Sequence, residues 1–281
     1  MLRRSGWILT TLALCALPGV DRAEAQNWRT LTSSRQVSGE DEVTVEVKYA
    51  AGRFTVKPGD GDSLYDMTLT YDEDNFEPVS EYRRGILTLG VDGIRKNVDI
   101  DGDNESRLDL LLTRRVPMDL KLEFGAVKAD FDLSGVPLKS LSVTTGASES
   151  LLVVDELNPI PMGTVEIEVG AASFKSRGLG NLNAERINVD AGVGNVELDL
   201  TGEWNRDGRV SVDMGLGALT LTLSPEMGIR LTKDTFLTGL DAEGLEKRNG
   251  GYYSANWDTA EYQLEINVDA AFGKIEVVWA R

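Results

Sequence analysis

The sequence predicts an all-β chain, built as a right-handed parallel β-solenoid-like stack that follows an antiparallel, hairpin-rich N-terminal region. One sequence phrase occurs three times, at residues 189–198, 212–221 and 268–277. Each copy consists of a short alternating strand, a corner of small residues and a second alternating strand. Corner glycines follow one another at spacings of 21, 24, 22 and 23 residues, or about 22 residues per rung. Such regular spacing is typical of stacked repeats. A meander or β-sandwich is the alternative, because alternation alone does not separate parallel from antiparallel strands.

The first 25 residues have the pattern of a cleavable signal peptide. Arg3 and Arg4 give a basic start, residues 8–17 are apolar, and residues 23–25 form an Ala-Glu-Ala cleavage site. The apolar stretch is too short to span a bilayer. The pattern predicts export to the periplasm or the extracellular space of a bacterium, after cleavage near Ala25. An uncleaved anchor is the alternative.

Composition excludes several classes of function. Cys15, the single cysteine, lies in the leader, and the chain contains no histidine. The mature chain therefore lacks disulfides, thiol nucleophiles, cysteine or histidine metal sites and Ser-His-Asp catalysis. The formal net charge of −17 disfavours contact with nucleic acid and with anionic lipid. We expect no cofactor and no nucleic-acid partner, and a basic protein or neutral glycan of the envelope as binding partner.

The N-terminal region, residues 26–115, has short alternating segments separated by turn residues. Ala50, Ala51 and Gly52 predict a turn between two strands, and the acidic segment 72–82 predicts a connection between two others. The strands expected in this region span residues 43–47, 54–56, 67–71, 86–89 and 107–112.

From residue 116 to residue 281 the repeat predicts rungs. Ile187, Val189 and Ala191 alternate with polar residues, so they are expected to point inward while Asp190 points outward. Gly192 is expected to turn the corner with a positive φ angle. An insertion at about residues 237–261 interrupts the last repeats.

Segments along nearly the whole mature chain resemble a known family. The segments similar to the N-terminal domain of toast-rack proteins are 28–29, 49–56 and 64–78, and those similar to the C-terminal domain of LiaF-like proteins are 228–231, 250–257 and 266–277. The resemblance implies a β-rich stacked fold in bacterial cell-envelope proteins, mostly of unknown function. It also implies a boundary between a toast-rack-like domain at 26–115 and a LiaF-like domain at 116–281. It supplies no catalytic residues.

The strongest candidate site is a ladder of acidic residues. One acidic residue precedes the corner in most repeats, and Thr144 interrupts the series; its members are Glu123, Glu168, Asp190, Asp213 and Asp269. In a stack they would form a row on one outer face, which could bind a divalent cation such as Ca²⁺ or a basic partner. The other interpretation, which we favour on the sequence alone, is a solvated face whose charges prevent sideways sheet pairing.

A second candidate is the aromatic group in the insertion. Tyr252, Tyr253 and Trp257 follow a turn at residues 249–251. They could stack on a sugar or on a protein partner. They could equally shield the last rung of the stack, and this capping role is the one we favour.

These observations predict a non-catalytic, exported envelope protein that binds or scaffolds through the faces of its stack. One alternative, which rests on the family resemblance, is a module regulating envelope stress. LiaF-like proteins have N-terminal membrane helices, whereas this chain has a cleavable leader. Another alternative is a β-helix enzyme acting on glycans, which would need non-repeating Asp with Lys or Arg on one sheet face. The sequence offers no such group.

Overall fold

The computed structural model describes residues 27–93 and 106–281, so the predicted signal peptide lies outside the described residues. Nearly all elements belong to one sheet with strand order β1-β3-β6-β2-β7-β8-β9-β10-β11-β15-β12-β14-β13, and β4 pairs with β5, which pairs with β2. The elements are β1 (Trp28–Gln36), β2 (Val43–Gly59), β3 (Ser63–Asp72), β4 (Phe76–Arg83), β5 (Ile86–Gly93), β6 (Arg107–Thr113), β7 (Met118–Asp132), β8 (Leu138–Val153), β9 (Met162–Arg177), the short 3-10 helix η1 (Leu179–Leu182), β10 (Ala184–Asp199), β11 (Gly208–Leu223), β12 (Gly228–Asp241), β13 (Glu246–Arg248), β14 (Gly251–Tyr253) and β15 (Gln263–Trp279).

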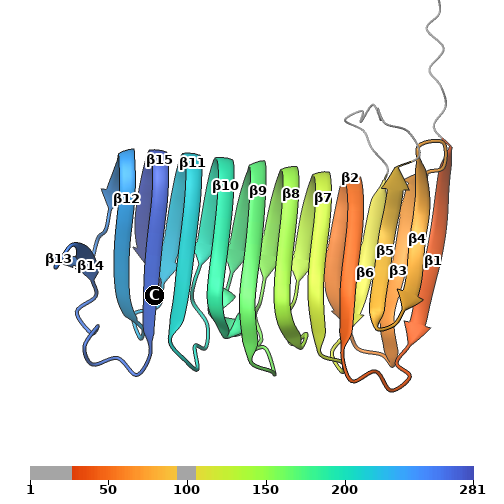
Figure 1. Ribbon diagram of the computed structural model, residues 1–281, viewed down its shortest axis with the longest axis horizontal. Coiled ribbons are helices and arrows are strands. Elements are labelled where there is room, and N and C mark those ends of the chain that lie inside the picture. The colour runs from red at the N-terminus through yellow and green to blue at the C-terminus, as the bar shows by residue number, and fades with distance from the viewer. Residues whose placement is uncertain (1–26, 94–105) are drawn as a thin grey trace, which may run out of the picture.

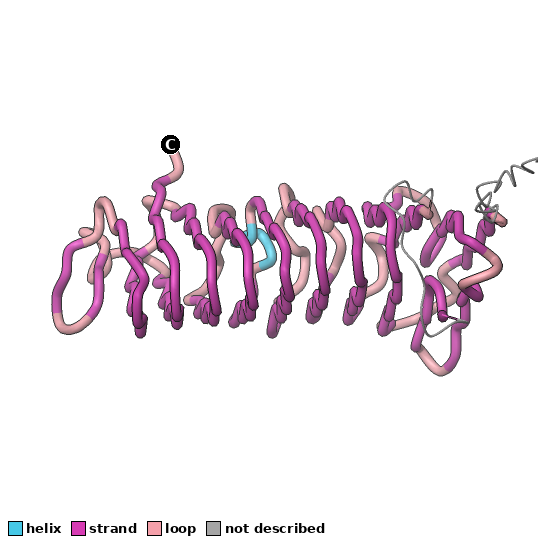
Figure 2. The backbone as a smooth tube through the Cα atoms, turned by 90° about the horizontal axis from the view of Figure 1, so that it is seen from above, coloured by secondary structure: helices cyan, strands magenta, loops and turns pink. Residues whose placement is uncertain are grey.

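Eight long strands, β2, β7, β8, β9, β10, β11, β15 and β12, form the stack (Figure 1). Every neighbouring pair among them is parallel, and equivalent positions of the repeat are paired. This confirms the stacked, parallel architecture. Each strand continues through its corner, so one rung is a long bent strand plus a returning connection (Figure 2).

The bend places both arms of a strand around the same interior. In β10, the buried residues Ile187, Val189 and Ala191 alternate before the corner, and Val196 and Leu198 alternate after it. The step from 191 to 196 is odd, so the inward-facing parity changes at the corner. Both arms therefore direct apolar side chains into one core, which the connections close on the remaining side.

The corner requires glycine at a different position from the one expected. Gly192 does not have a positive φ angle, whereas Gly194, Gly217 and Gly273, two residues later in each phrase, have φ angles of 148°, 153° and 144°. Gly192 is small for another reason, because a Cβ there would lie 2.7 Å from the carbonyl oxygen of Gly170 on the next rung. The expectation of a positive φ at Gly192 is therefore wrong, and close stacking of backbones explains that glycine.

The N-terminal region joins the stack more closely than the sequence suggested. Segments 43–47 and 54–56 are two arms of one bent strand, β2, which pairs in parallel with β7, so no hairpin forms between them. The acidic connection contains a strand, β4, antiparallel to β5. Residues from Val43 in β2 to Val277 in β15 form one continuous core, and no break falls near residue 115.

The C-terminal strands stack out of chain order. Strand β15 lies between β11 and β12, although β12 precedes it in the sequence. Strand β12 continues to Asp241, so the insertion begins after that residue. Within the described ranges, no helix has the length and apolarity needed to cross a membrane.

Candidate functional site

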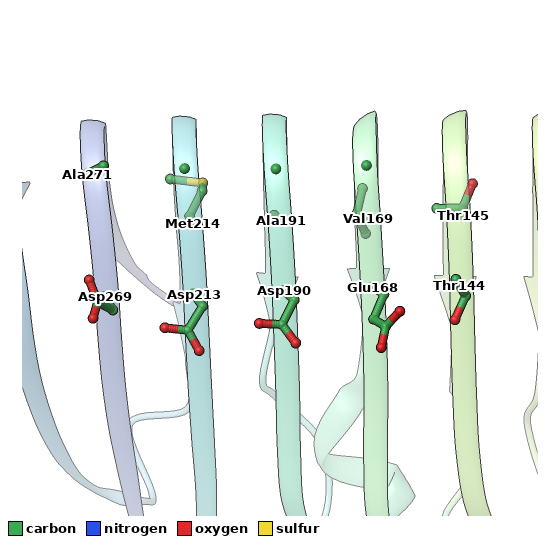
Figure 3. Close-up of a pocket in the computed structure, with 13 residues that line it drawn as sticks. Thr144, Thr145, Glu168, Val169, Asp190, Ala191, Asp213, Met214, Asp269 and Ala271 are labelled. Atoms are coloured by element: carbon green, nitrogen blue, oxygen red, sulfur yellow. The ribbon is translucent and has the colours of Figure 1, made fainter.

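Four acidic side chains occupy the same position on the neighbouring strands β9, β10, β11 and β15. Asp190 is paired with Glu168 on one side and with Asp213 on the other. Asp213 is paired in turn with Asp269. Figure 3 shows them side by side at one level, with Thr144 next in line. Because neighbouring strands are about 4.8 Å apart, these like charges repel one another.

The row extends further in one direction than the sequence revealed, and is interrupted in the other. Asp234 of β12 is paired with Asp269 and lengthens the row. Glu123 is separated from it by Thr144 and forms an ion pair of 3.2 Å with Lys48. We call the five members Glu168, Asp190, Asp213, Asp269 and Asp234 the carboxylate row.

One lysine, Lys233 of β12, lines the same surface pocket as Asp213, Asp234 and Asp269, and its ammonium group donates to the Thr235 hydroxyl at 3.1 Å. None of the members of the carboxylate row forms an ion pair within the described ranges, and all five are exposed. The nearest outward positions on β11 and β15 are neutral, namely Ser211 and Asn267, whereas the equivalent position on β9 is the acidic Glu166. The arginines beyond them are already paired, since Glu265 accepts from Arg209 at 3.3 Å and from Arg230 at 3.0 Å. The row is therefore a line of negative charge whose members form no ion pairs within the described residues.

A groove of about 700 Å³ runs beside the row and crosses β8, β9, β10, β11 and β15. Its floor is the corner backbone at Gly170, Gly192 and Gly215, where no side chain fills the space. The Thr145 hydroxyl, in a residue only 5% exposed, lines the groove and has no hydrogen-bond partner among the described residues. The groove is thus long, open, floored by backbone and acidic on one side.

A line of exposed apolar residues follows directly after the groove-lining residues Gly192, Gly215 and Ala271 in the chain. Val193 is paired with Leu216, and Leu216 with Phe272. Phe272 is paired with Leu237 and contacts Phe236 edge to face, with ring centroids 6.0 Å apart. We call these five residues the apolar ridge. From the sequence, Val193 and Leu216 are expected only as parts of corners, although an apolar residue between two glycines is a signal for an exposed apolar position.

Asp213, at the centre of the row, has a carboxyl group with a shifted pKa. Partial burial first, and then the charges of Asp190 and Asp269, raise the pKa of Asp213. Within the described residues, no group of three acidic side chains is arranged to hold a metal ion. The arrangement is that of a charged strip, and calcium binding stays a hypothesis.

Replacement of Asp213 by asparagine is expected to stabilise the protein at neutral pH. A folded-state pKa above the unfolded value of about 3.9 means that the folded chain binds this proton more tightly. The resulting stabilisation is complete below the unfolded pKa and is lost as pH rises through the folded one. We expect Asp213→Asn to gain up to about 1 kcal/mol at pH 7, because the group is exposed and screened.

Thermal unfolding of both proteins from pH 3 to pH 7, at low and high salt, measures this difference. The gain should disappear towards pH 3 and shrink at high salt. A gain that is independent of pH would show that the charge of Asp213 is not its cause.

The aromatic group lies at the end of the stack. Tyr252 and Tyr253 belong to β14, which pairs with the terminal strand β12 at Leu231 and Arg230. Tyr253 contacts Trp257 with ring centroids 5.6 Å apart, and the Arg248 guanidinium lies 4.5 Å from the Tyr253 ring. The three aromatic side chains are half-buried. They do not adjoin the groove, and the capping role stays a prediction.

Replacement of Trp257 by alanine is expected to destabilise the protein by about 1–2 kcal/mol, because the indole packs on Tyr253 at the exposed end of the core. Differential scanning calorimetry measures the change. An unchanged melting temperature would contradict the capping role and would leave these aromatic rings available for ligand contact.

Comparison with known proteins gives a match to one family model. The model of the N-terminal domain of toast_rack, DUF2154, matches residues 23–175 and, in a second match, residues 156–222. Both matches end before β12, so the resemblance of the later segments to LiaF-like proteins stays a prediction. A search of curated proteins found no match.

Several solved structures are similar over most of their length. One is described as a "putative cell adhesion protein" from Clostridium sporogenes, at 15% identity and a TM-score of 0.48, covering 90% of this chain and 100% of the other. Another is a "putative adhesin" from Parabacteroides merdae, at 10% identity and a TM-score of 0.38, covering 90% and 97%. Both TM-scores lie below 0.5.

Proposed function

This chain belongs to the family of the N-terminal domain of toast_rack, DUF2154, and on that premise we propose that it is a non-catalytic, exported protein of the cell envelope. In this proposal it binds or scaffolds a partner through the outer face of its strand stack. The groove, together with the carboxylate row and the apolar ridge, is the binding face, and the partner is a basic envelope protein.

The single observation that supports this role is the carboxylate row, free of ion pairs within the described residues, along an open groove. Evenly repeated charges of one sign create a field that attracts and orients a partner of the opposite sign. Placing these charges side by side has an electrostatic free-energy cost. At Asp213, besides partial burial, this repulsion contributes to a raised pKa, since two of its causes are the charges of Asp190 and Asp269. Solubility requires net charge but no particular arrangement of it on the surface. The alignment of these charges in one row therefore favours a binding role.

A binding role suits the row better than a catalytic one. Catalysis by carboxyl pairs depends on two groups whose different environments separate their pKa values and so their roles as acid and base. Here successive members occupy equivalent positions of a repeat, as the pairing of Asp190 with Asp213 shows. Equivalent environments favour repeated, equal contacts with a long partner.

Site-specific photo-crosslinking in the native envelope tests the proposal. A photoreactive phenylalanine analogue replaces Asn195, an exposed residue three positions after Gly192, which lines the groove. The matched control places it at Glu203, an exposed residue of the connection between β10 and β11. We expect a discrete protein adduct from position 195 and none from position 203.

The absence of an adduct at position 195, or equal adducts at both positions, would contradict binding through this face. Incubation with a panel of acidic polysaccharides provides the test of the enzymatic alternative. Release of any product would overturn the non-catalytic assignment.

A further inference from the structure

We propose that the apolar ridge and the carboxylate row together dock one cationic amphipathic α-helix of a partner protein, laid along the axis of the stack. This inference rests on the proposed function and specifies the partner's chemistry and secondary structure. It begins from the ridge, which the family match does not explain.

The ridge is a contiguous patch of exposed large apolar side chains. The exposed fraction is 51% for Val193, 51% for Leu216, 44% for Phe272, 64% for Leu237 and 77% for Phe236. Most of the other apolar side chains of β10, β11 and β15 are directed into the core. Contiguous exposed apolar patches on soluble proteins mark interaction sites, because their burial against a partner is favourable.

Charge complementarity identifies the occupant. On β10, β11, β15 and β12 a ridge residue follows the acidic residue by three positions, as Val193 follows Asp190 and Leu216 follows Asp213. The partner surface must therefore present lysine or arginine immediately beside apolar side chains. The unpaired Thr145 hydroxyl inside the groove is a further polar group that a bound partner can satisfy.

The carboxylate row and the apolar ridge run in parallel on one surface and differ in chemistry. This arrangement favours a helix over an extended strand as the bound segment of the partner. A strand directs successive side chains to opposite faces, whereas a helix can carry a basic stripe and an apolar stripe next to each other. One helical turn advances about 5.4 Å, close to the strand spacing of about 4.8 Å, so successive turns meet successive rungs. The partner helix then lies in the groove with its basic stripe over Asp190 and its apolar stripe against Val193.

A designed helix provides a direct test. The probe is a fluorescent peptide of leucine and lysine of about 18 residues, or five helical turns, with the two residue types on adjacent stripes. One control peptide has the same composition with the leucines spread around the helix, and the other has glutamate in place of lysine. Fluorescence anisotropy with the full chain should show saturable binding of the first peptide, at least about tenfold tighter than either control.

Paired protein variants locate the binding. Asp190→Asn with Asp213→Asn, and separately Val193→Ser with Leu216→Ser, should each weaken binding about tenfold. The matched controls remove exposed residues elsewhere and should stay within about twofold of the parent. They are Glu203→Gln with Glu226→Gln for charge, and Leu151→Ser with Val278→Ser for apolar surface. Far-ultraviolet circular dichroism confirms that each variant is folded.

Equal affinity for the amphipathic and the spread peptides, or unchanged affinity in the ridge variant, would overturn the inference, because simple charge attraction would then explain binding. If crosslinking at position 195 gives an adduct but the peptide does not bind, the proposed function stands and the helix inference fails. If neither is observed, both fail.

Discussion

Gly217→Ala is expected to destabilise the protein by roughly 3 kcal/mol or more. Gly217 has a φ angle of 153°, a conformation that residues with a Cβ rarely adopt. An added Cβ would also overlap the carbonyl oxygen of Gly194 on the neighbouring rung. Since the colliding atom belongs to the backbone of a packed strand, neither rung can yield without breaking register. Urea unfolding followed by tryptophan fluorescence measures the loss.

Gly239 provides the matched control for this substitution. It lies past the corner of β12, and a Cβ added there would meet nothing within 4 Å. Gly239→Ala is therefore expected to change the unfolding free energy by less than about 0.5 kcal/mol. A loss below about 1 kcal/mol for Gly217→Ala would contradict the close stacking of corners described here.

Phe54→Ala is expected to cost about 3–5 kcal/mol, and to do so in a single unfolding transition. Phe54 is fully buried in β2, where its ring centroid lies 5.0 Å from that of Phe131 and 5.9 Å from that of Phe124, both in β7. Removal of the ring leaves a cavity and breaks these edge-to-face contacts. Because β2 and β7 lie on opposite sides of the boundary expected near residue 115, the same substitution tests whether that boundary separates two folding units.

Phe236→Ala is the control, since this phenylalanine is 77% exposed and contacts one other ring. Its loss should stay below about 1 kcal/mol. Two separate transitions in the Phe54 variant, one of them unchanged from the parent, would show that residues 26–115 and 116–281 fold independently.

The rungs of the stack could be predicted because two local signals agree. Period-two alternation fixes which residues face the core, and the glycine spacing fixes where each strand bends. The carboxylate row follows from the same signals, since Asp190 and Asp213 stand at the same offset from a corner. The bend in β2 was not predicted, because turn residues alone do not distinguish a hairpin turn from the corner of one bent strand. Ala50 to Gly52 resemble a hairpin turn, yet buried Ala51 and Phe54 show the parity change of a corner.

The placement of β15 between β11 and β12 could not be predicted from the sequence. Chain order does not determine the order of strands in the sheet when a connection is long. Here the connection after β12 lets β15, the last strand of the chain, lie between β11 and β12. Asp234 was missed for a related reason, because the corner of β12 at residues 235–238 contains no glycine to mark it. The ridge was missed because apolar residues such as Val193 and Leu216 were assigned to corners without considering whether they were exposed.

The register of the row is most directly tested by a pulsed electron paramagnetic resonance distance between spin labels at Glu123→Cys and Asp269→Cys, in a Cys15→Ser background. These positions are separated by β8, β9, β10 and β11. The structure therefore predicts one narrow distance near 24 Å between the backbones, five intervals of about 4.8 Å, widened by the label linkers. A broad distribution, or a centre displaced by one strand spacing or more, would contradict both the stacking order and the continuous acidic groove built on it.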